Sequence, residues 1–310
     1  MTGRSCECLS VRNFRGATTG TEKGSVNLIK AWVGLIRGFP LRVAPNFPHG
    51  SVVMTPPHKH VISLARHGRR RDAFFRNNPH LSDVNVFSAV DGWALSRPEL
   101  VAQGIIAPEN TYVEPALGVL MSHVTLWREA VTRNVPLTIM EDDVIVREDF
   151  DVRTCALMAE HDECDAVFWG ANTDWPLSVR LGGGLPDATL LFDETTGGKR
   201  ALSAQSESSP TLMRVLGLAG ICCYTVSPQG AQRLLDRALP VGNIPAHARH
   251  FEAGIGVRSH PINWQNTGLD VEISRQAEAL DMWVCLPFLA TSPNDWAESS
   301  FERKGHVVQA

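Results

Sequence analysis

The chain has 310 residues, of which 44% are hydrophobic, and its formal net charge is −4. This length and composition suffice for a sizeable core in one large domain or two small ones. The acidic balance argues against nucleic acid as the main partner, and no apolar run approaches the ~20 residues that cross a bilayer. The N-terminus lacks an apolar segment followed by a cleavage site, so we expect no signal peptide.

The chain begins with a segment, residues 1–57, that we interpret as a basic, partly disordered extension and linker. Within it, "SVNLIKAWVGLIRGF" is amphipathic at helical spacing and carries basic residues on its polar face. Such a helix can make a peripheral contact with an anionic membrane surface. The alternatives are a helix docked on the main domain and a non-essential extension, and two glycines weaken the helix in each case.

Residues 58–310 carry the periodic patterns of a folded domain. "HVISL" is typical of a strand, and "ARHGRRRDAFFRNN" follows it as a basic loop and helix. "VNVFSAVDG" is a second strand that ends at Asp91-Gly92. Between residues 117 and 133, Leu120, Val124, Trp127 and Val131 recur at helical spacing, which predicts a helix with one buried stripe. "VPLTIM" is the next strand, and "EDDV" stands at its carboxyl end.

Helices and strands continue to alternate in the second half. "FDVRTCALMAEHDE" predicts a helix, and "DAVFWGAN" predicts a strand. Residues 173–210 are rich in glycine and small polar residues, and we expect a long mobile loop there. "LGLAGICCYTV" predicts a strand, "SPQGAQRLLDRAL" a helix with Ser227 as N-cap and Pro228 in its first turn, and "MWVCLPFLA" a further strand. This alternation predicts an α/β sheet with helices on both faces, in which ligands bind outside the carboxyl ends of strands.

Seven cysteines are present, at positions 6, 8, 155, 164, 222, 223 and 285. An odd number, partly inside apolar stretches, indicates free thiols in a reducing compartment, so we expect a cytoplasmic chain. Cys6 and Cys8 resemble a metal-binding pair, but no second pair stands at the spacing of a zinc site.

Three consecutive carboxylates, Glu141, Asp142 and Asp143, follow the strand "VPLTIM". Carboxylate oxygens at a strand end suit Mg²⁺ or Mn²⁺, and such an ion commonly neutralises a diphosphate. The alternative is a solvated acidic turn that begins the next helix. Arg66 and Arg70 follow the first strand, and guanidinium groups match phosphate oxygens, although a solvated helix face is the alternative for each arginine.

Several motifs occur together in one order: "VISLARHGRRR", "FSAVDG", "LGVLMSHVTLWREAV", "PLTIMEDDV", "VFWGAN" and "YTVSPQGAQRLL". In this order and spacing they resemble glycosyltransferase family 25, the lipooligosaccharide-type galactosyltransferases, over roughly residues 60–239. The resemblance implies a GT-A-type nucleotide-sugar-binding fold with a mostly parallel sheet flanked by helices. It also implies inverting transfer of a sugar from a nucleotide-sugar donor, UDP-linked, to a saccharide or glycolipid acceptor with help from Mn²⁺ or Mg²⁺.

The resemblance assigns roles to particular residues. Asp142 and Asp143 would hold the metal. The stretch "NTGLDVEIS" offers Asp270 and Glu272 as the general base that takes the acceptor proton, and we favour Asp270. The predicted nucleotide-sugar-binding residues are Leu64, Arg66, Arg70, Asp91, Ser122, His123, Glu141 and Asp142. His123 shares a helix face with Leu120 and Trp127, so a buried, hydrogen-bonded histidine is the alternative there. Asp91-Gly92 is also a common turn.

The chain departs from the family pattern in two positions and one segment. Ala65 stands where many relatives have Asp, and Leu120 stands at the usual Cys position. The His-rich stretch "PAHARHFEAGIGVRSHPINW" has no clear counterpart and separates Asp270 from the preceding motif. His250 and His260 lie in that stretch, and we assign no role to either.

The leading functional hypothesis is therefore a metal-dependent glycosyltransferase that places a sugar, galactose, on a cell-surface glycan precursor. A metal-dependent phosphohydrolase is one alternative, because paired Asp residues also serve that chemistry, and it would release phosphate without a saccharide acceptor. A non-catalytic glycan-binding module on a degenerate transferase scaffold is the other, and it would bind glycan without turnover.

Overall fold

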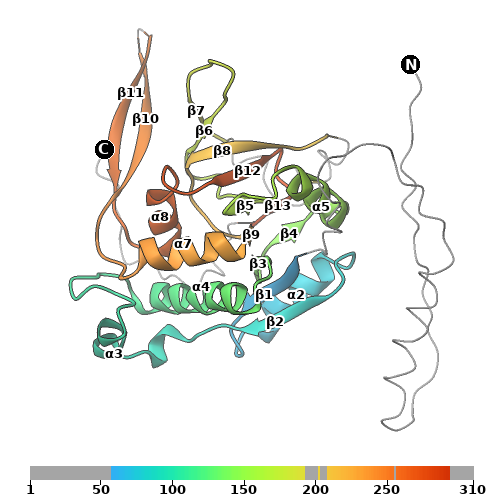
Figure 1. Cartoon of the computed structure of the whole chain (residues 1–310), viewed down its shortest axis with the longest axis vertical. Helices are drawn as coiled ribbons and strands as arrows, with labels where there is room; N and C mark the ends of the chain where they lie inside the picture. The colour runs from blue at the N-terminus through green and yellow to red at the C-terminus, as the bar shows by residue number, and fades with distance from the viewer. Residues whose placement is uncertain (1–56, 193–201, 203–207, 255, 294–310) are drawn as a thin grey trace, which may run out of the picture. The chain divides into compact units, whose positions relative to one another are not determined.

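The computed structural model describes residues 57–192, 202, 208–254 and 256–293 (Figure 1). The chain divides into two units between Val53 and Met54, and every described residue belongs to the second. The predicted extension of residues 1–57, with its amphipathic segment and Cys6 and Cys8, lies outside the described residues except for Pro57.

A nine-stranded sheet forms the centre of the described unit, in the order β2-β1-β3-β9-β5-β12-β8-β6-β7. In that order the strands are Val84–Ser88, His58–Ser63, Leu137–Glu141, Cys223–Val226, Ala166–Phe168, Met282–Leu286, Thr211–Gly217, Leu177–Arg180 and Ala188–Leu190. β1 pairs in parallel with β2 and β3, and β5 pairs in parallel with β12, whereas the other neighbours are antiparallel. Only β9, β8 and β7 therefore run against the remaining strands of this described sheet, and the predicted α/β class with a mostly parallel sheet is confirmed.

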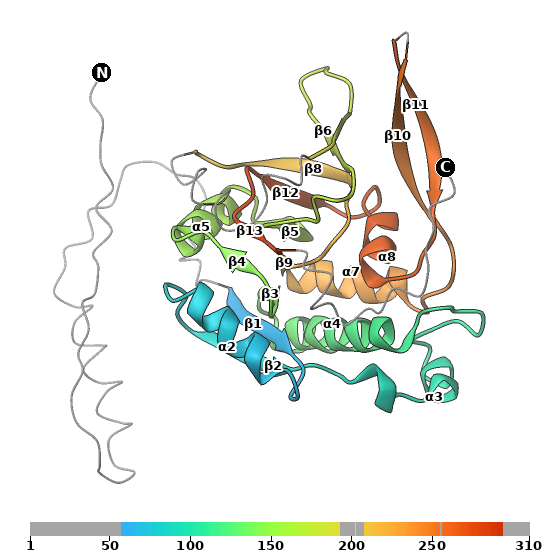
Figure 2. The ribbon, with the colours of Figure 1, turned by 180° about the vertical axis from the view of Figure 1, so that it is seen from behind.

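Helices cover both faces of this sheet. Alternate residues of β3 point to opposite faces, so Leu137 and Ile139 join one hydrophobic cluster and Met140 joins another. The first cluster includes residues of α4 (Glu114–Arg133), α7 (Pro228–Ala238) and α8 (Leu269–Arg275), and the second includes residues of α2 (Gly68–Asn77) and α5 (Phe150–Glu160). α4 and α7 run side by side in both views (Figures 1 and 2).

Two of the predicted helices have the features that their sequences indicate. In α4, Leu120, Val124 and Trp127 are fully buried, which confirms the predicted stripe. In α7, the Ser227 hydroxyl accepts a 3.0 Å hydrogen bond from the amide of Gly230, and Pro228 is the first helical residue. The predicted N-cap is thus confirmed.

The predicted mobile loop of residues 173–210 is wrong in its first half. β6 and β7 form an antiparallel hairpin within it, and β6 also pairs with β8, so the hairpin extends the sheet. Leu177 and Val179 are buried, and the Ser178 and Thr189 hydroxyls share a 2.9 Å hydrogen bond across the strands. The alternation in "LSVR" was concealed by the adjacent glycines, which build the hairpin tip. Residues 193–201 and 203–207 of the predicted loop lie outside the described part of the chain.

The single strand predicted for "LGLAGICCYTV" is two strands in the structure. β8 ends at Gly217 and β9 begins at Cys223. Between them, Gly220 has a φ of +76°, which is incompatible with extended backbone. The chain therefore turns here, and the backbone of this turn forms hydrogen bonds in the site described below.

Smaller elements complete the described unit. They are the single turn η1 (Gly92–Ala94), the short helix α3 (Arg97–Ala102), the two-stranded sheet of β4 (Ile145–Val146) and β13 (Ala290–Thr291), and the long hairpin of β10 (Ala246–Gly254) and β11 (Gly256–Trp264). The hairpin β10–β11 is the His-rich stretch, for which the sequence alone indicates no element.

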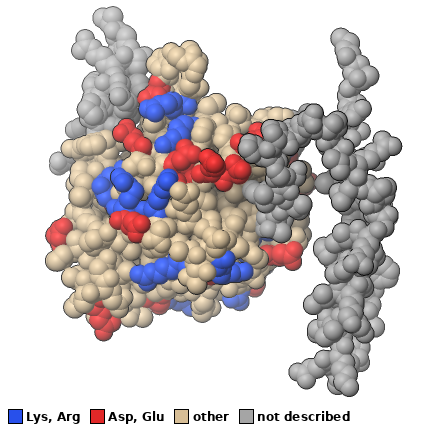
Figure 3. All heavy atoms as spheres, in the orientation of Figure 1, with Lys and Arg blue, Asp and Glu red and all other residues tan. Residues whose placement is uncertain are grey.

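The described residues also show the state of the cysteines and the distribution of charge on one face. Cys155, Cys164, Cys222, Cys223 and Cys285 are free thiols, as predicted. On the face in Figure 3, acidic and basic side chains form several separate groups with uncharged residues between them. Within the described residues, the helices are all too short or too polar to traverse a bilayer.

Candidate active site at the carboxyl edge of the sheet

Three parallel strands bring the predicted acidic and basic segments to one edge of the sheet. β1, β2 and β3 are adjacent and parallel, so their carboxyl ends meet at the same side. The basic turn and α2 follow β1, whereas Glu141 is the last residue of β3 and precedes Asp142 and Asp143. Ligands of α/β sheets bind at such an edge.

Arg70 links the basic helix to the acidic strand end. Its Nη2 lies 2.7 Å from Asp142 Oδ1 and 3.2 Å from Asp143 Oδ2. Asp142 is buried, and its Oδ2 accepts a 2.8 Å hydrogen bond from the Ser63 hydroxyl at the end of β1. Asp142 and Asp143 therefore both contact the basic helix that follows β1, and Asp142 is shielded from solvent.

The remaining two acids of the triplet are electrostatically strained. Burial raises the pKa of Glu141 to about 8, and the carboxylates of Asp143 and Asp270 act in the same direction, whereas Arg70 opposes them. Burial also raises the pKa of Asp143, against the effect of Arg70. Asp143 Oδ1 is buried and has no hydrogen-bond partner among the described residues. An uncompensated carboxylate oxygen of this kind is a ready acceptor for a cation.

Asp270 joins this group from a distant part of the chain. It lies in the first turn of α8, and its Oδ2 accepts a 3.2 Å hydrogen bond from the amide of Gly220. Burial raises the pKa of Asp270, and its charge acts on Glu141. The structure thus places the predicted general base beside the acidic triplet, and its catalytic role stays a prediction.

The turn at Gly220 is fixed by close packing. A Cβ added to Gly220 would lie 2.1 Å from Asn172 Oδ1, and the amide of Asn172 donates a 2.8 Å hydrogen bond to Ala219 O. Asn172 ends the motif "VFWGAN", which follows β5 at the same edge of the sheet. Only glycine fits this contact, so the turn that holds Asp270 is set by backbone shape.

Arg66 and Asp91 form an ion pair at the ends of β1 and β2. The hydrogen bond from Arg66 is the main cause that lowers the pKa of Asp91, and the amide of Trp93 donates to the same carboxylate at 3.2 Å. Leu64 is half-buried in the turn after β1, where its carbonyl accepts a 2.8 Å hydrogen bond from the amide of His67. These three predicted nucleotide-sugar-binding residues therefore lie at the same sheet edge as Arg70.

The predicted contact of Ser122 and His123 with the nucleotide sugar is not supported, because both residues are only 1% exposed. Ser122 Oγ accepts a 2.9 Å hydrogen bond from the amide of Val90 and donates to Gly118 O. The Tyr224 hydroxyl accepts from Trp127 Nε1 at 2.9 Å and shares a 2.7 Å hydrogen bond with His123 Nδ1. These residues hold the loop after β2 and the core in place, and His123 is the buried, hydrogen-bonded histidine of the alternative interpretation.

The oxygen atoms of these carboxylates are chemically suited to a hard divalent cation. The carboxylates of Asp142, Asp143 and Asp270 all act on Glu141, and Arg70 contacts Asp142 and Asp143. Asp143 Oδ1 has no hydrogen-bond partner among the described residues. Oxygen ligands and excess negative charge are what Mg²⁺ and Mn²⁺ require. Nowhere in the described residues do three His, Cys, Asp or Glu side chains already converge as a metal site. Arg70 occupies the space between Asp142 and Asp143 instead.

Sequence reasoning missed three contributors to the site: Ser63, Asn172 and Gly220. Ser63 and Asn172 follow the same rule as the acidic triplet, because each stands at the carboxyl end of a strand that runs parallel to β3. That rule could have found them. Gly220 has no such signal, because its role depends on a contact with Asn172 that only the fold creates.

Comparison with known proteins places this arrangement in a family. The family model for glycosyltransferase family 25 (LPS biosynthesis protein) matches residues 56–246, which is more than half of the chain. Procollagen galactosyltransferase 2 of mouse and that of human are each 30% identical to it over 128 residues, which are 38% of this chain and 19% of theirs. The bovine protein named probable inactive glycosyltransferase 25 family member 3 is 29% identical over 197 residues, 58% of this chain and 31% of that protein.

These matches span less than a third of the length of each curated relative. A solved structure, the mannose-1-phosphate geranyltransferase from Thermus thermophilus, is 14% identical with a TM-score of 0.31, covering 60% of this chain and 62% of that one, and is too distant to inform the function. The matched family segment runs from β1 through α7 and contains the basic turn and the acidic strand end. The chain therefore belongs to glycosyltransferase family 25.

Proposed function

We propose that this chain transfers galactose from a UDP-linked donor to a hydroxyl of a saccharide acceptor, with inversion at the sugar carbon and with a divalent cation. The observation that carries the proposal is the contact of Arg70 with Asp142 and Asp143, together with the charge of Asp270 that acts on the adjacent Glu141. Membership of the family supports glycosyl transfer, and the galactosyltransferases among the relatives support galactose as the sugar.

The donor side of the site is the edge formed by the ends of β1 and β2. Arg66 and Arg70 offer guanidinium groups that match phosphate oxygens bidentately. Asp91 and Glu141 stand at the neighbouring strand ends, where a carboxyl group can accept ribose hydroxyls. Both arginines contact carboxylates at these strand ends, Arg66 that of Asp91 and Arg70 that of Asp142.

Asp142 and Asp143 would hold the cation, Mn²⁺ or Mg²⁺, and Asp143 contributes the oxygen without a hydrogen-bond partner among the described residues. When bound, the cation would neutralise the charge on the departing nucleoside diphosphate. Ser63 keeps Asp142 in position through its hydrogen bond.

Asp270 is the proposed general base. Transfer with inversion requires one group that takes the proton from the acceptor hydroxyl as that oxygen attacks the sugar carbon. Burial raises the pKa of Asp270, which makes its carboxylate a stronger base than an exposed aspartate. The amide of Gly220 holds one of its oxygens in place.

We further propose a glycolipid acceptor, such as a lipooligosaccharide precursor, and a cytoplasmic chain whose basic amphipathic segment in residues 1–57 contacts the inner face of the membrane. The family description as an LPS biosynthesis protein supports the acceptor class. The basic excess of the segment supports the contact with anionic lipid.

Calorimetric titration with UDP and Mn²⁺, together with UDP release from UDP-galactose, tests the proposal. We expect Asp143→Ala to abolish Mn²⁺-dependent UDP binding, and Asp270→Asn to keep that binding while transfer falls by about 100-fold or more. Asp236→Asn is the matched control, because the exposed Asp236 carboxylate on α7 accepts a hydrogen bond from Gln232 of the same helix and belongs to neither side of the site.

The same experiments separate the alternatives. A phosphohydrolase would release inorganic phosphate from UDP, or UMP and galactose 1-phosphate from UDP-galactose, without any acceptor. A glycan-binding module would bind saccharide while releasing no UDP. Intact protein that does not bind UDP in the presence of Mn²⁺, or that binds it equally well as Asp143→Ala, would refute the proposed function.

A further inference from the structure

A stacked pair of tryptophans lies in the segments that flank the candidate active site. Trp175 follows β5, and Trp264 is the last residue of β11. Their ring centroids are 4.5 Å apart with 26° between the planes. Trp264 is 9% exposed, whereas Trp175 keeps 39% of its surface exposed. The buried indole thus supports a second indole that remains open to a ligand.

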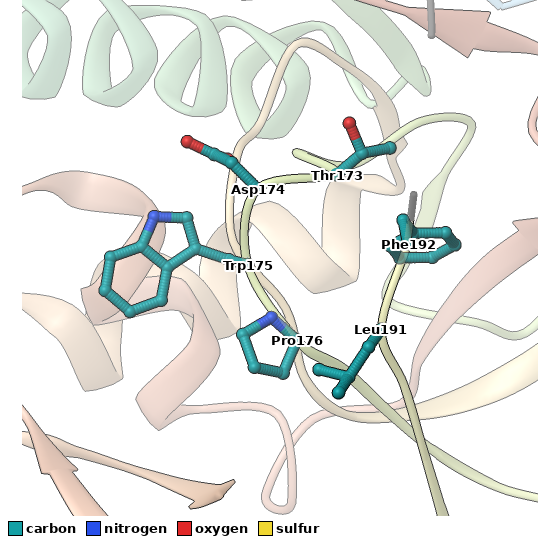
Figure 4. Close-up of a pocket in the computed structure, with 6 residues that line it drawn as sticks. All are labelled: Thr173, Asp174, Trp175, Pro176, Leu191 and Phe192. Atoms are coloured by element: carbon teal, nitrogen blue, oxygen red, sulfur yellow. The ribbon is translucent and has the colours of Figure 1, made fainter. Parts of the chain in front are cut away.

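The open indole lines a small cavity whose chemistry is mixed. Figure 4 shows the side chains of Asp174 and Trp175 extending to the same side of their segment, with Leu191 and Phe192 on the neighbouring segment. The lining residues are Thr173, Asp174, Trp175, Pro176, Leu191 and Phe192. The cavity therefore offers a flat aromatic surface, one hydroxyl and one carboxylate, and its described lining contains no Lys or Arg.

This lining matches a sugar ring better than a nucleoside diphosphate. A pyranose has an apolar face of C–H groups that packs on an aromatic ring, and hydroxyls around its rim that donate to a carboxylate. A diphosphate needs cations, and the carboxylate of Asp174 would repel it. The phosphate-matching arginines are instead at the ends of β1 and β2, so this cavity suits the acceptor rather than the donor.

Short connections tie the tryptophan pair to Asp270 from both sides. Trp175 lies three residues after Asn172, at most about 11 Å along extended backbone, and Asn172 packs against the Gly220 turn that binds Asp270. Trp264 lies two residues before Asn266, whose amide donates a 2.6 Å hydrogen bond to buried Glu272 of α8. The platform is thus fixed to the helix that carries the proposed base.

We infer that Trp175 forms the floor of a subsite for the acceptor sugar ring, supported by Trp264 and completed by the carboxylate of Asp174. This inference rests on the proposed function, because it requires Asp270 to meet an acceptor hydroxyl. It goes beyond that function in two ways: it names the residues that recognise the acceptor, and it attributes the recognition to aromatic stacking. The subsite presents one sugar ring to Asp270 while the donor occupies the arginine side.

The test compares four proteins: wild type, Trp175→Ala, Trp175→Phe and the control Phe75→Ala. Phe75 is a fitting control, because it has the same 39% exposure and also belongs to an aromatic pair, with Phe74 at 5.2 Å. UDP release from UDP-galactose with Mn²⁺ is measured without acceptor and with increasing concentrations of the methyl glycosides of galactose, glucose and N-acetylglucosamine.

We expect Trp175→Ala to raise the KM for the glycoside that stimulates wild type by about tenfold, the loss expected for one stacking contact. Release without acceptor and Mn²⁺-dependent UDP binding are expected to stay within about twofold of wild type, because the donor side is untouched. Trp175→Phe, which keeps a ring, is expected to lie between the two, and Phe75→Ala to match wild type. Retained Mn²⁺-dependent UDP binding in Trp175→Ala would show that the alanine variant is folded.

Binding of the same glycosides is read independently from the intrinsic tryptophan fluorescence. Wild type is expected to respond with saturation, and Trp175→Ala is expected to lose that response. A glycoside response together with no UDP binding would refute the proposed function and leave the subsite supported. An unchanged KM in Trp175→Ala, or no member of the panel acting on a wild type that hydrolyses UDP-galactose, would overturn the subsite.

Discussion

The Ser63 hydroxyl donates a 2.8 Å hydrogen bond to Asp142 Oδ2, and this bond joins the carboxyl ends of β1 and β3 across 79 positions of the chain. Because Arg70 holds the other oxygen of Asp142, that carboxylate is engaged on both sides. Asp143, in contrast, keeps one oxygen without a hydrogen-bond partner among the described residues. We infer a division of roles in which Asp142 is the fixed member and Asp143 the one that responds to a cation.

Removing the Ser63 hydroxyl tests how firmly Asp142 is held. Ser63→Ala leaves a buried carboxylate oxygen without its donor, and we expect the free energy of unfolding to fall by about 1–3 kcal/mol. Urea denaturation measures this loss. Thr125→Ala is the control, because the exposed Thr125 hydroxyl donates to the carbonyl of Met121 within the same helix. Equal losses in both variants would contradict the role of Ser63.

Arg70 is the counter-ion of the acidic strand end, so its removal should make the fold responsive to metal. Arg70→Ala leaves the buried carboxylate of Asp142 without its cation, and we expect a loss of about 3 kcal/mol. Millimolar Mn²⁺ should then recover part of this stability, since an ion that binds only the folded state stabilises it. Thermal unfolding with and without Mn²⁺ measures both effects.

The control for Arg70→Ala is Arg76→Ala, which removes an exposed arginine from the last turn of the same helix. It should neither lose comparable stability nor gain from Mn²⁺. If Mn²⁺ leaves the melting temperature of Arg70→Ala unchanged, the four carboxylates do not attract a cation in the way proposed.

His123 predicts a pH dependence of stability. Burial lowers its pKa to about 3 from an ordinary value of 6.5, so between these values the unfolded state binds more protons than the folded state. Stability from this group is therefore complete above pH 6.5 and is lost as the pH falls towards 3. Between pH 7 and pH 5 the expected loss is about 2 kcal/mol.

Urea denaturation of wild type and His123→Gln at the two pH values isolates this contribution, because the amide of glutamine can still form a hydrogen bond with the Tyr224 hydroxyl. The variant should lose less stability than wild type on acidification. His161→Gln, which removes a half-buried imidazole packed on Trp283, is the control and should keep the wild-type dependence. The same slope in all three proteins would show that His123 titrates normally.

Close packing at Gly92 predicts that a side chain at this position would disturb the donor side of the site. A Cβ at Gly92 would lie 1.7 Å from the carbonyl oxygen of Glu114, so the loop after β2 must move away from α4 in Gly92→Ala. We expect a loss of about 2 kcal/mol or more in stability and weaker UDP binding, because Asp91 and its partner Arg66 move with the loop. Calorimetry and denaturation measure the two effects.

Gly242→Ala is the matched control, since a Cβ there meets only a side-chain oxygen of Glu109 at 3.4 Å and a methyl group at 3.9 Å among the described residues. It is expected to change stability by less than about 1 kcal/mol. UDP binding unaffected in Gly92→Ala would mean that the Asp91 loop does not contribute to the donor site.

Much of the fold was predictable because local pattern and burial agree. The stripe of Leu120, Val124 and Trp127 indicates a buried helix, and the apolar run before Glu141 indicates a buried strand. The hairpin of β6 and β7 was not predictable in the same way. Its strands are short, and the flanking glycines, which have positive φ, are also typical of mobile loops.

The site was predictable in its position and less so in its contacts. The acidic triplet and Arg70 follow strands, so the rule that parallel strands end at one edge brings them together. His123 was assigned to the ligand because its motif is similar to that of the family, whereas its helix face points into the core. The contact between Gly220 and Asp270 depends on the long-range packing of α8, which no local pattern reports.

The place of β12 in the sheet has a consequence for the biosynthesis of the protein. Although β12 is late in the chain, it lies between β5 and β8 and pairs with both. As the nascent chain leaves the ribosome, β5 and β8 therefore lack the strand that lies between them until residue 286 has emerged. Translation must run almost to the end of the described region before the facing edges of β5 and β8 are paired.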